Sequence, residues 1–364
     1  MNKNDVTLTE ARKKINEIDQ KMAKLFEERM EAAFDVASYK IKHALPIYDE
    51  AREQEVIKRN SIYITNDVIR EYYVNFLKDT MDISKQYQSR LIKGMKVAYS
   101  GVEGAFAHIA AMRMFPNAIY KNYPDFKLAY KAVENGECDT CVLPLENSFA
   151  GEVGLVMDLM FSGSLYINQA LEIEIVHNLL GKKGANIKEI KKVYSHQQAL
   201  SQCAKYIDEH HLEAVDVVNT AYAAKFVAEG NDLSHAAIAS SDTAKLYDLD
   251  ILESNINQSR NNTTRFGAFS RVLNQDSNSK SMTNHFILVF TVKNEAGSLA
   301  KTLNIIGSYG FNMRSLRSRP MKELIWNYYF YVELEGDINS SEGKEMINAL
   351  GIFCDKLKVV GIYR

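Results

Sequence analysis

The chain has 364 residues, a length that allows about two or three domains. Its formal net charge of −2 lacks the basic excess that is typical of proteins that grip a nucleic-acid backbone. No apolar run approaches the roughly 20 residues of a membrane span, and the stretch MNKNDVTLTEARKK lacks the apolar core of a signal peptide. We therefore expect a cytoplasmic protein with neither nucleic-acid nor membrane partners, and with its four scattered cysteines reduced.

Residues 1–93 are predicted to form an all-helical domain. Thr7 and Glu10 fit a T-x-x-E capping box, and apolar residues then recur at helical spacing up to about residue 42. Pro46 interrupts this pattern, a second helix is predicted from about residue 49, and a third from 67 to 92. No glycine occurs before Gly94, which suits long helices without tight turns.

Residues 94–274 are predicted to form an α/β domain with a largely parallel sheet. The strand-like stretches MKVAYSG, CDTCVLPLENS, IKKVYSHQQ and AAIASSD alternate with helical stretches such as 124–135 and 197–211. Cys138 and Cys141 form a C-x-x-C without the second pair that a zinc site needs, so we expect two buried core cysteines and no metal.

Residues 274–284 have the polar, Ser- and Asn-rich composition of a linker. Beyond them, residues 284–364 show strands and helices in the order β-α-β-β-α-β, which is the ferredoxin-like pattern. The predicted fold class is therefore multidomain: an all-α segment, an α/β segment and an α+β segment.

The first helix carries two cations on its apolar face. On a helical wheel Arg29 and Lys40 fall in the middle of the apolar arc, about 16 Å apart along the axis. Buried cations are costly unless an anion meets them. Other polar residues share faces of the second and third helices: Asp49, Arg52 and Glu53, and Ser84 and Gln88. The set favours a site for a small dianion with an ether oxygen, and the alternative is a buried ion network that pairs Arg29 with Glu53.

The spacing R-x(16)-R-x(10)-K-x(8)-D-x(2)-R-E, followed by S-x(3)-Q, resembles the all-helical chorismate mutases over about residues 5–93. The resemblance implies that Arg29 and Arg12 of the partner subunit bind the two carboxylates of chorismate. Lys40 and Gln88 would address the ether oxygen, Glu53 with Asp49 a hydroxyl, and Arg52 and Ser84 the remaining carboxylate contacts. Arg12 lies about 100° round the helix from Arg29 and nearly five turns away, so we expect a dimer with interlocked helices.

Polar clusters follow several strand-like stretches of the α/β segment. They are YSGVEGAFAH, PLENSFAGEV, YSHQQALSQC, NTAYAA and NNTTRF. Ligands of α/β sheets bind beyond the carboxyl ends of the strands, so these clusters are candidates for one cleft. The glycines of the first cluster lack the dinucleotide fingerprint, and His196 alone suits a structural hydrogen bond as well as a general base.

Together these clusters resemble prephenate dehydratases over about residues 95–273, with Val102 and Gln197 in place of family prolines. The resemblance implies two α/β lobes, like a periplasmic binding protein, and conversion of prephenate to phenylpyruvate, water and carbon dioxide. Thr264 would assist the leaving hydroxyl and Arg265 would hold a carboxylate. The remaining polar site positions would be Glu146, Asn147, Ser195, His196 and Gln202. For Arg265 the alternative is an ion pair with an acidic residue across the cleft.

The C-terminal segment resembles an ACT domain, a regulatory module that pairs with a second copy. Gly297, Ser298 and Leu299 stand where the family has G-A-L. Arg317, Ser318, Arg319 and Pro320 stand where it has E-S-R-P. The resemblance implies L-phenylalanine as effector, but Arg317 reverses a charge, which leaves another effector or a structural role open.

Taken as a whole, the chain resembles the bifunctional chorismate mutase–prephenate dehydratases, which need no cofactor. It would act as a homo-oligomer that makes phenylpyruvate from chorismate on the way to phenylalanine. A different class, a non-catalytic amino-acid sensor with a binding cleft and an ACT module, is the alternative, and a mutase with an inactive second domain is a further one. The sequence leaves open dimer against tetramer, prephenate against arogenate, and direct transfer of prephenate between the sites.

Overall fold

The computed structural model describes residues 7–43, 45–258, 261–273, 285–321 and 327–363. The chain forms two compact units, Met1–Met95 and Lys96–Arg364. The linker predicted at residues 274–284 lies outside the described residues. In the described part of the chain, no helix combines the length and the apolar character that crossing a membrane requires.

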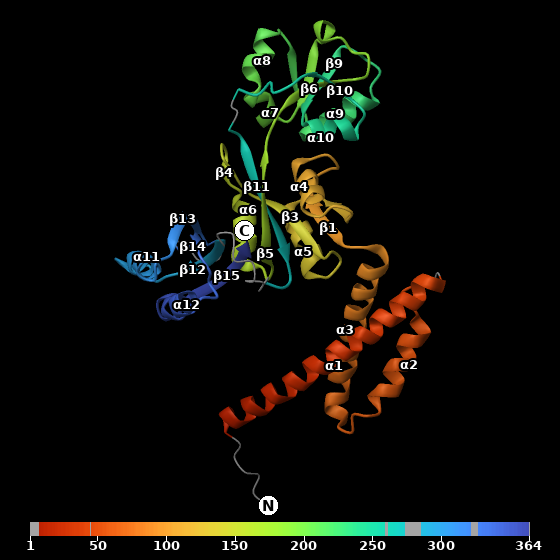
Figure 1. The fold of residues 1–364 in the computed structure, drawn as a ribbon, viewed down its shortest axis with the longest axis vertical. Helices are drawn as coiled ribbons and strands as arrows, with labels where there is room; N and C mark the ends of the chain where they lie inside the picture. The colour runs from red at the N-terminus through yellow and green to blue at the C-terminus, as the bar shows by residue number, and fades with distance from the viewer. Residues whose placement is uncertain (1–6, 44, 259–260, 274–284, 322–326, 364) are drawn as a thin grey trace, which may run out of the picture. The chain divides into compact units, whose positions relative to one another are not determined.

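The first unit consists of the three predicted helices, α1 (Leu8–His43), α2 (Glu50–Ser61) and α3 (Asp67–Lys93) (Figure 1). The capping box is confirmed, because Glu10 N donates to Thr7 Oγ1 at 3.3 Å and Thr7 N donates to Glu10 Oε2 at 2.9 Å. Asp49 and Asn66 cap α2 and α3, and Gly94 ends α3 at a φ of 91°. Local capping signals therefore set all three helix starts.

Helix α1 packs against α3 along its second half and exposes apolar side chains along its first half. Ala33 and Ala37 are its buried residues, and Met81 of α3 is buried as well. Ile15 is 55% exposed and Leu25 is 62% exposed. A run of exposed apolar residues on one helix is typical of a surface that another protein covers.

The second unit contains a 10-stranded sheet with the order β13-β14-β12-β15-β5-β11-β3-β1-β2 and β4 paired to β3. Its dehydratase-like part comprises β1 (Lys96–Ser100), β2 (Ile119–Tyr123), β3 (Thr140–Asn147), β4 (Gly151–Glu152), β5 (Tyr166–Glu174) and β11 (Thr263–Ser270), with helices α4 (Phe106–Met114), α5 (Phe126–Glu134) and α6 (Gly154–Ser162). Strand β1 is parallel to β2 and β3, whereas β11 is antiparallel to β3 and β5. Within this part of the sheet, the prediction of largely parallel strands therefore holds for β1, β2 and β3, and it holds again for three strands of the second sheet.

A separate five-stranded sheet has the order β10-β6-β9-β7-β8. It comprises β6 (Asn178–Gly181), β7 (Lys192–Ser195), β8 (Glu213–Asp216), β9 (His235–Ala239) and β10 (Asp250–Glu253), with the short 3₁₀ helix η1 (Ile187–Glu189) and helices α7 (Gln197–Gln202), α8 (Ala204–Glu209), α9 (Thr220–Glu229) and α10 (Ser241–Leu246). The stretch over 197–211 is helical as predicted, but the backbone leaves the helical region at the buried Cys203 and divides the stretch into α7 and α8.

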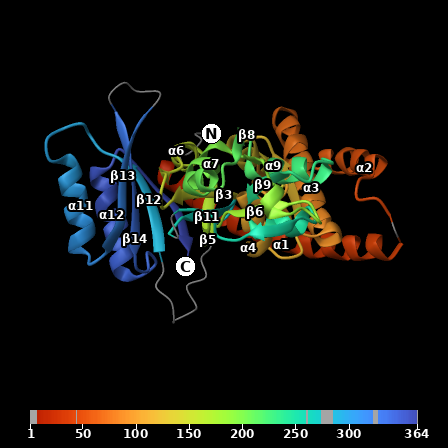
Figure 2. The same ribbon diagram turned by 90° about the horizontal axis from the view of Figure 1, so that it is seen from above.

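The C-terminal part follows the predicted order of elements. These are β12 (His285–Thr291), α11 (Ser298–Ser308), β13 (Asn312–Pro320), β14 (Tyr328–Glu335), α12 (Ser341–Phe353) and β15 (Lys356–Tyr363). Helices α11 and α12 lie on one face of these strands (Figure 2). Strand β12 is apolar on both faces. Phe286 and Leu288 pack toward the helices, whereas Ile287 and Val289 pack into the core of the dehydratase-like part, which is called the neighbouring lobe below.

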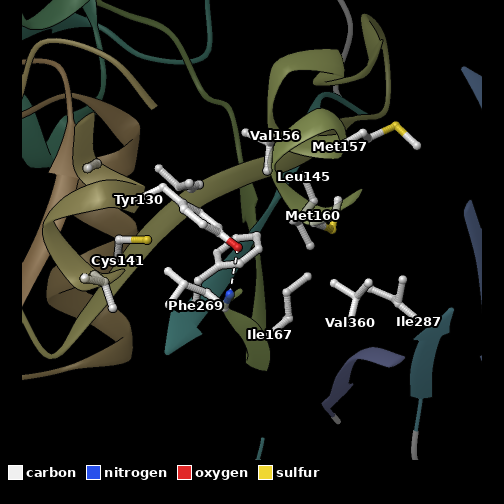
Figure 3. Packing of buried hydrophobic residues seen from close by; sticks show 14 of the residues in the cluster. Tyr130, Cys141, Leu145, Val156, Met157, Met160, Ile167, Phe269, Ile287 and Val360 are labelled. Atoms are coloured by element: carbon white, nitrogen blue, oxygen red, sulfur yellow. Dashed lines mark hydrogen bonds between the residues drawn. The ribbon is translucent and has the colours of Figure 1, made fainter. Parts of the chain in front are cut away.

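The core that contains Ile287 and Val289 joins the C-terminal strands to the rest of the second unit. Figure 3 shows Ile287 and Val360 beside Met160, Ile167 and Leu145. Gly361 of β15 pairs with Ile167 of β5, so one sheet runs through both parts. A side chain at Gly361 would lie 2.5 Å from the Ile167 carbonyl oxygen, which accounts for glycine at this close approach. The C-terminal part is thus continuous with the dehydratase-like part through sheet and core.

Candidate active sites

In the helical unit, Arg29 of α1 reaches across to α3. Its Nη1 donates to Ser84 Oγ and, at 3.3 Å, to the Thr80 carbonyl oxygen. Burial lowers the pKa of Arg29. Ser84 and Gln88 are buried on the same face of α3, one turn apart. Gln88 Oε1 has no hydrogen-bond partner among the described residues. The structure therefore brings together three of the predicted mutase residues.

Arg29 and Glu53 do not form the ion pair that was the alternative. Glu53 instead pairs with Lys85 at 2.8 Å, and Lys85 also pairs with Asp82 at 2.7 Å. Within the described ranges, no carboxylate lies within ion-pair distance of Arg29. Its positive charge is thus met by neutral oxygen atoms, which leaves it able to attract an anion.

The other predicted mutase residues have local partners. Lys40 Nζ donates to the Ile47 carbonyl oxygen at 2.6 Å. Asp49 caps α2 by accepting from Arg52 N at 3.0 Å, and the exposed Arg52 side chain pairs with Glu55 at 2.7 Å. Arg12 is exposed, about 25 Å along α1 from Arg29. One chain therefore does not bring Arg12 to the other mutase residues.

In the second unit, amides and a hydroxyl form a chain of hydrogen bonds at the start of β11. Asn147 Nδ2 donates to Thr264 Oγ1 at 2.9 Å and to Asn262 Oδ1 at 2.7 Å. Asn262 Nδ2 donates to Gln202 Oε1 at 3.0 Å. Because Thr264 Oγ1 accepts from Asn147, its own O–H can donate to a ligand. Three predicted residues, Asn147, Gln202 and Thr264, are thereby connected.

His177 begins this chain. Its Nε2 lies 2.9 Å from Gln202 Oε1, an oxygen that can only accept, so His177 donates from Nε2. Burial lowers the pKa of His177 against the effect of this bond, which keeps the ring neutral. His177 and Asn262 were not predicted from the sequence. For Asn262 the signal was its place in NNTTRF, three residues before the arginine, whereas His177 carries none.

Arg265 does not point toward this chain. Its Nη1 and Nη2 donate to the two carboxylate oxygens of Glu333 at 2.7 and 2.6 Å, and Nη2 also pairs with Glu146 at 2.8 Å. Successive residues of a strand face opposite sides of the sheet, so Arg265 and Glu146 lie behind Thr264 and Asn147. This arrangement agrees with the ion-pair alternative and does not support the predicted carboxylate clamp. The main partner is on β14 rather than across the cleft.

Ser195 and His196 hold secondary structure together. Ser195 is 0% exposed and its Oγ donates to the Ile238 carbonyl oxygen at 2.7 Å, which links β7 to β9. His196 is exposed and caps α7, with Nδ1 accepting from Gln198 N at 3.2 Å. Neither side chain belongs to the hydrogen-bonded chain that ends at Thr264.

The R-S-R-P segment of β13 is bound to the neighbouring lobe. Arg317 lies 3.8 Å from Glu152 of β4, and Arg319 lies 3.1 Å from Asp158 of α6. Ser318 and Pro320 pair with β14. At the other predicted regulatory stretch, Gly297 adopts a φ of 83° before α11, Ser298 begins the helix and Leu299 packs on the C-terminal core. The reversed charge at Arg317 therefore meets an acidic partner within the chain.

The predictions for cysteines agree with the structure, because Cys138 and Cys141 are both buried. Among the described residues, no group of three or more His, Cys, Asp or Glu side chains is arranged to hold a metal ion. A cavity of roughly 600 Å³ beside the β1–α4 loop is lined by residues that include Tyr99, Glu103 and His108. This cavity is not lined by any of the hydrogen-bonded side chains described above, those of His177, Gln202, Asn262, Asn147 and Thr264.

Comparison with known proteins identifies two segments of the chain. Residues 11–89 match the chorismate mutase type II family, and residues 97–273 match the prephenate dehydratase family. The bifunctional chorismate mutase/prephenate dehydratase of Aquifex aeolicus is 30% identical over 365 residues, which cover 98% of this chain and 97% of that protein. The chain belongs to the bifunctional chorismate mutase/prephenate dehydratase family.

Solved structures agree with this assignment. The prephenate dehydratase of Staphylococcus aureus is 25% identical, has a TM-score of 0.65, and is covered over 100% of its length by 74% of this chain. The prephenate dehydratase of Arthrobacter aurescens in complex with L-Phe is 24% identical and has a TM-score of 0.67. The match covers 74% of this chain and 89% of that chain. The second comparison shows that the fold is shared.

As a member of this family, the bifunctional enzyme rearranges chorismate to prephenate and then converts prephenate to phenylpyruvate in phenylalanine biosynthesis. The non-catalytic sensor is not favoured, and neither is a mutase with an inactive second domain. The two family matches name one activity each, and the full-length relatives name both.

The hydrogen-bonded chain predicts an effect for Asn262, which was not among the predicted site residues. We expect Asn262→Ala to lower dehydratase kcat about 10- to 100-fold, because Asn147 and Gln202 each lose a buried partner and Thr264 loses its fixed neighbour. Initial rates with prephenate measure this effect. Mutase rates of the same protein serve as the control, and an unchanged dehydratase kcat would contradict the assignment of Asn262 to the site.

Proposed function

We propose that the two reactions occur at separate sites, chorismate rearrangement at Arg29 and prephenate dehydration at Thr264. The observation that carries the proposal is the contrast between the two settings. Arg29 is a half-buried cation with no carboxylate partner among the described residues, and Thr264 presents a hydroxyl whose oxygen already accepts a hydrogen bond.

At the first site the reaction needs no nucleophile. A pericyclic rearrangement needs its substrate held in a compact conformer and donors aimed at the charge that develops on the ether oxygen. Arg29 would bind a carboxylate, with Ser84 orienting its guanidinium and Arg52 completing the carboxylate contacts. The Gln88 amide and Lys40, released from the Ile47 carbonyl, would donate to the ether oxygen. Glu53 and Asp49 would accept from a substrate hydroxyl.

The mutase site is proposed to require a second subunit. Arg12 is too far along α1 to reach Arg29 of its own chain, and the first half of α1 exposes Ile15 and Leu25. Pairing two copies along this apolar surface would cover it and would deliver Arg12 of the partner subunit to the second carboxylate. A homo-oligomer follows from this proposal.

At the second site, loss of the ring carboxylate as carbon dioxide would supply the electron pair that makes the ring aromatic and expels the C4 hydroxyl. Thr264 would donate a hydrogen bond to the departing oxygen, and a proton delivered from solvent as the C–O bond breaks would let this oxygen leave as water. The Asn147 amide that donates to Thr264 Oγ1 would strengthen this donation by polarising the hydroxyl. Gln202 and Asn262 would hold Asn147 in place.

We propose that the C-terminal part is an ACT domain that binds an effector. Its β-α-β-β-α-β order and the left-handed Gly297 before α11 support this assignment. A prephenate dehydratase of the same fold, from Arthrobacter aurescens, was solved in complex with L-Phe, which favours L-phenylalanine as the ligand class. Arg317, engaged with Glu152, stands where the family pattern has a glutamate.

Reciprocal substitutions test the separation of the sites. Arg29→Ala should lower the mutase rate at least about 100-fold, because a carboxylate loses its cation, and should leave dehydration of prephenate unchanged. Thr264→Ala should do the reverse. Chorismate consumption and phenylpyruvate absorbance measure the two rates, and loss of both activities in either folded variant would refute separate sites.

Complementation tests the shared mutase site. Arg12→Ala and Arg29→Ala should each be inactive alone, whereas co-expression should restore about a quarter of the mutase rate, because random pairing makes half the dimers mixed and each mixed dimer has one complete site. Homodimers of each variant, purified and left unmixed, are the control. No recovery in co-purified mixed dimers would place Arg12 outside the site.

Phenylalanine titration tests the regulatory proposal. We expect weak inhibition of the dehydratase, because Arg317 replaces an acidic residue and already faces Glu152. Arg317→Glu should strengthen the inhibition. The dehydratase rate is measured against phenylalanine concentration. Strong inhibition of the unaltered enzyme at low phenylalanine would show that the effector site tolerates Arg317.

A further inference from the structure

Strand β14 has two chemically different faces. Val332 and Leu334 pack toward α11 and α12. The alternate positions Tyr329, Tyr331 and Glu333 face the core shared with the neighbouring lobe. Glu333 is only 1% exposed. The Glu333 carboxylate is therefore buried on the same face of β14 as Tyr329 and Tyr331.

Glu333 is held ionised at this buried position by two donors. Burial alone would raise its pKa, but the paired bonds from Arg265 and the bond from Tyr363 Oη at 2.6 Å outweigh it, and the pKa of Glu333 lies below its usual value. The pair is bidentate, which fixes orientation as well as distance. Arg265 Nε has no partner among the described residues, so the two carboxylates of Glu333 and Glu146 orient this guanidinium.

The other end of this ion pair lies directly behind the dehydratase residues. In the β11–β3 ladder, Arg265 is opposite Glu146 and Thr264 is opposite Asn147. On one face Arg265 joins Glu146 at 2.8 Å, and on the other face Asn147 donates to Thr264 at 2.9 Å. Because Arg265 and Thr264 are adjacent residues of β11, the ion pairs of Arg265 constrain the backbone that carries Thr264.

We propose that Glu333 is a positioning residue of the dehydratase. Through Arg265 it fixes β11 against β3, and thereby the alignment of the Thr264 hydroxyl with the Asn147 amide. The C-terminal part thus supplies one of the groups that align the catalytic strand, although none of its residues takes part in the hydrogen-bonded chain. This inference rests on the proposed role of Thr264.

The experiment uses the full-length enzyme with Glu333→Gln, Glu333→Asp and Tyr363→Phe. Glu333→Gln keeps the shape of the side chain but leaves Arg265 without its buried counter-charge. We expect kcat for prephenate to fall about 10- to 100-fold, as a displacement of about 1 Å can cause, with KM changed less than about twofold. The kcat of Glu333→Asp should lie between the kcat of Glu333→Gln and that of the unaltered enzyme. Tyr363→Phe should lower kcat by a smaller factor than Glu333→Gln does.

Two controls separate positioning from general loss of structure. Glu335→Gln, two residues along β14, removes a partly exposed carboxylate that bonds Asn312 and leaves Arg265 untouched, so it should leave dehydratase kcat unchanged. The mutase rate should be unchanged in every variant, because Glu333 and Tyr363 lie outside the helical unit. Thermal unfolding is recorded for each protein, and Tyr363→Phe provides a milder change if Glu333→Gln does not fold.

Two results would overturn the inference. Unchanged kcat in folded Glu333→Gln or Tyr363→Phe, with a lowered melting temperature, would make the ion pair structural. A raised KM at constant kcat would mean that Arg265 acts on prephenate itself.

If Thr264→Ala retains dehydratase activity, the role of Thr264 fails. If Thr264→Ala is inactive while Glu333→Gln keeps its kcat, the positioning role of Glu333 alone fails.

Discussion

The buried Glu333 carboxylate is the constraint around which the second unit is arranged. An ionised group at 1% exposure must be paired, and Arg265 and Tyr363 meet this need from two different strands. The pairing links β14 to β11, and the core around Ile287 and Ile167 surrounds the link with apolar side chains. Removing a partner of Glu333 leaves a buried charge without compensation. The contact between the C-terminal and dehydratase-like parts therefore requires a specific geometry in addition to the burial of apolar side chains.

Most of the fold could be predicted from the sequence because its signals are local. The capping box at Thr7, the cap at Asp49 and the continuous apolar run of β12 each lie within a few residues of the element they define. The joining of β15 to β5 could not be predicted, because Gly361 and Ile167 are 194 residues apart in the chain and meet through one backbone pairing. The division at Cys203 was missed because the apolar pattern continues through it.

The sequence grouped candidate site residues along the chain but did not show which way their side chains face. The stretch TTRF was interpreted as a polar cluster with Thr264 and Arg265 acting together. The same residues form the start of a strand, where neighbours face opposite sides, so one of them had to face away from the cleft. Asn262, two residues before Thr264 on the same side, joins it through Asn147. The side chain of Ser195 likewise links two strands, because its hydroxyl on β7 donates to the buried Ile238 carbonyl oxygen of β9.

Arg29 and Arg265 show that the surroundings of an arginine decide what it can bind. Arg265 is bound by two carboxylates and its pKa is raised, so its charge is already neutralised within the protein. Arg29 meets a hydroxyl and a carbonyl oxygen, and burial lowers its pKa, so an arriving anion would relieve an unfavourable state. A dianionic substrate therefore gains more at Arg29 than at Arg265. Under the roles proposed above, the same residue type would serve substrate binding in one unit and alignment in the other, because acidic neighbours are absent from the described surroundings of Arg29 and present at Arg265.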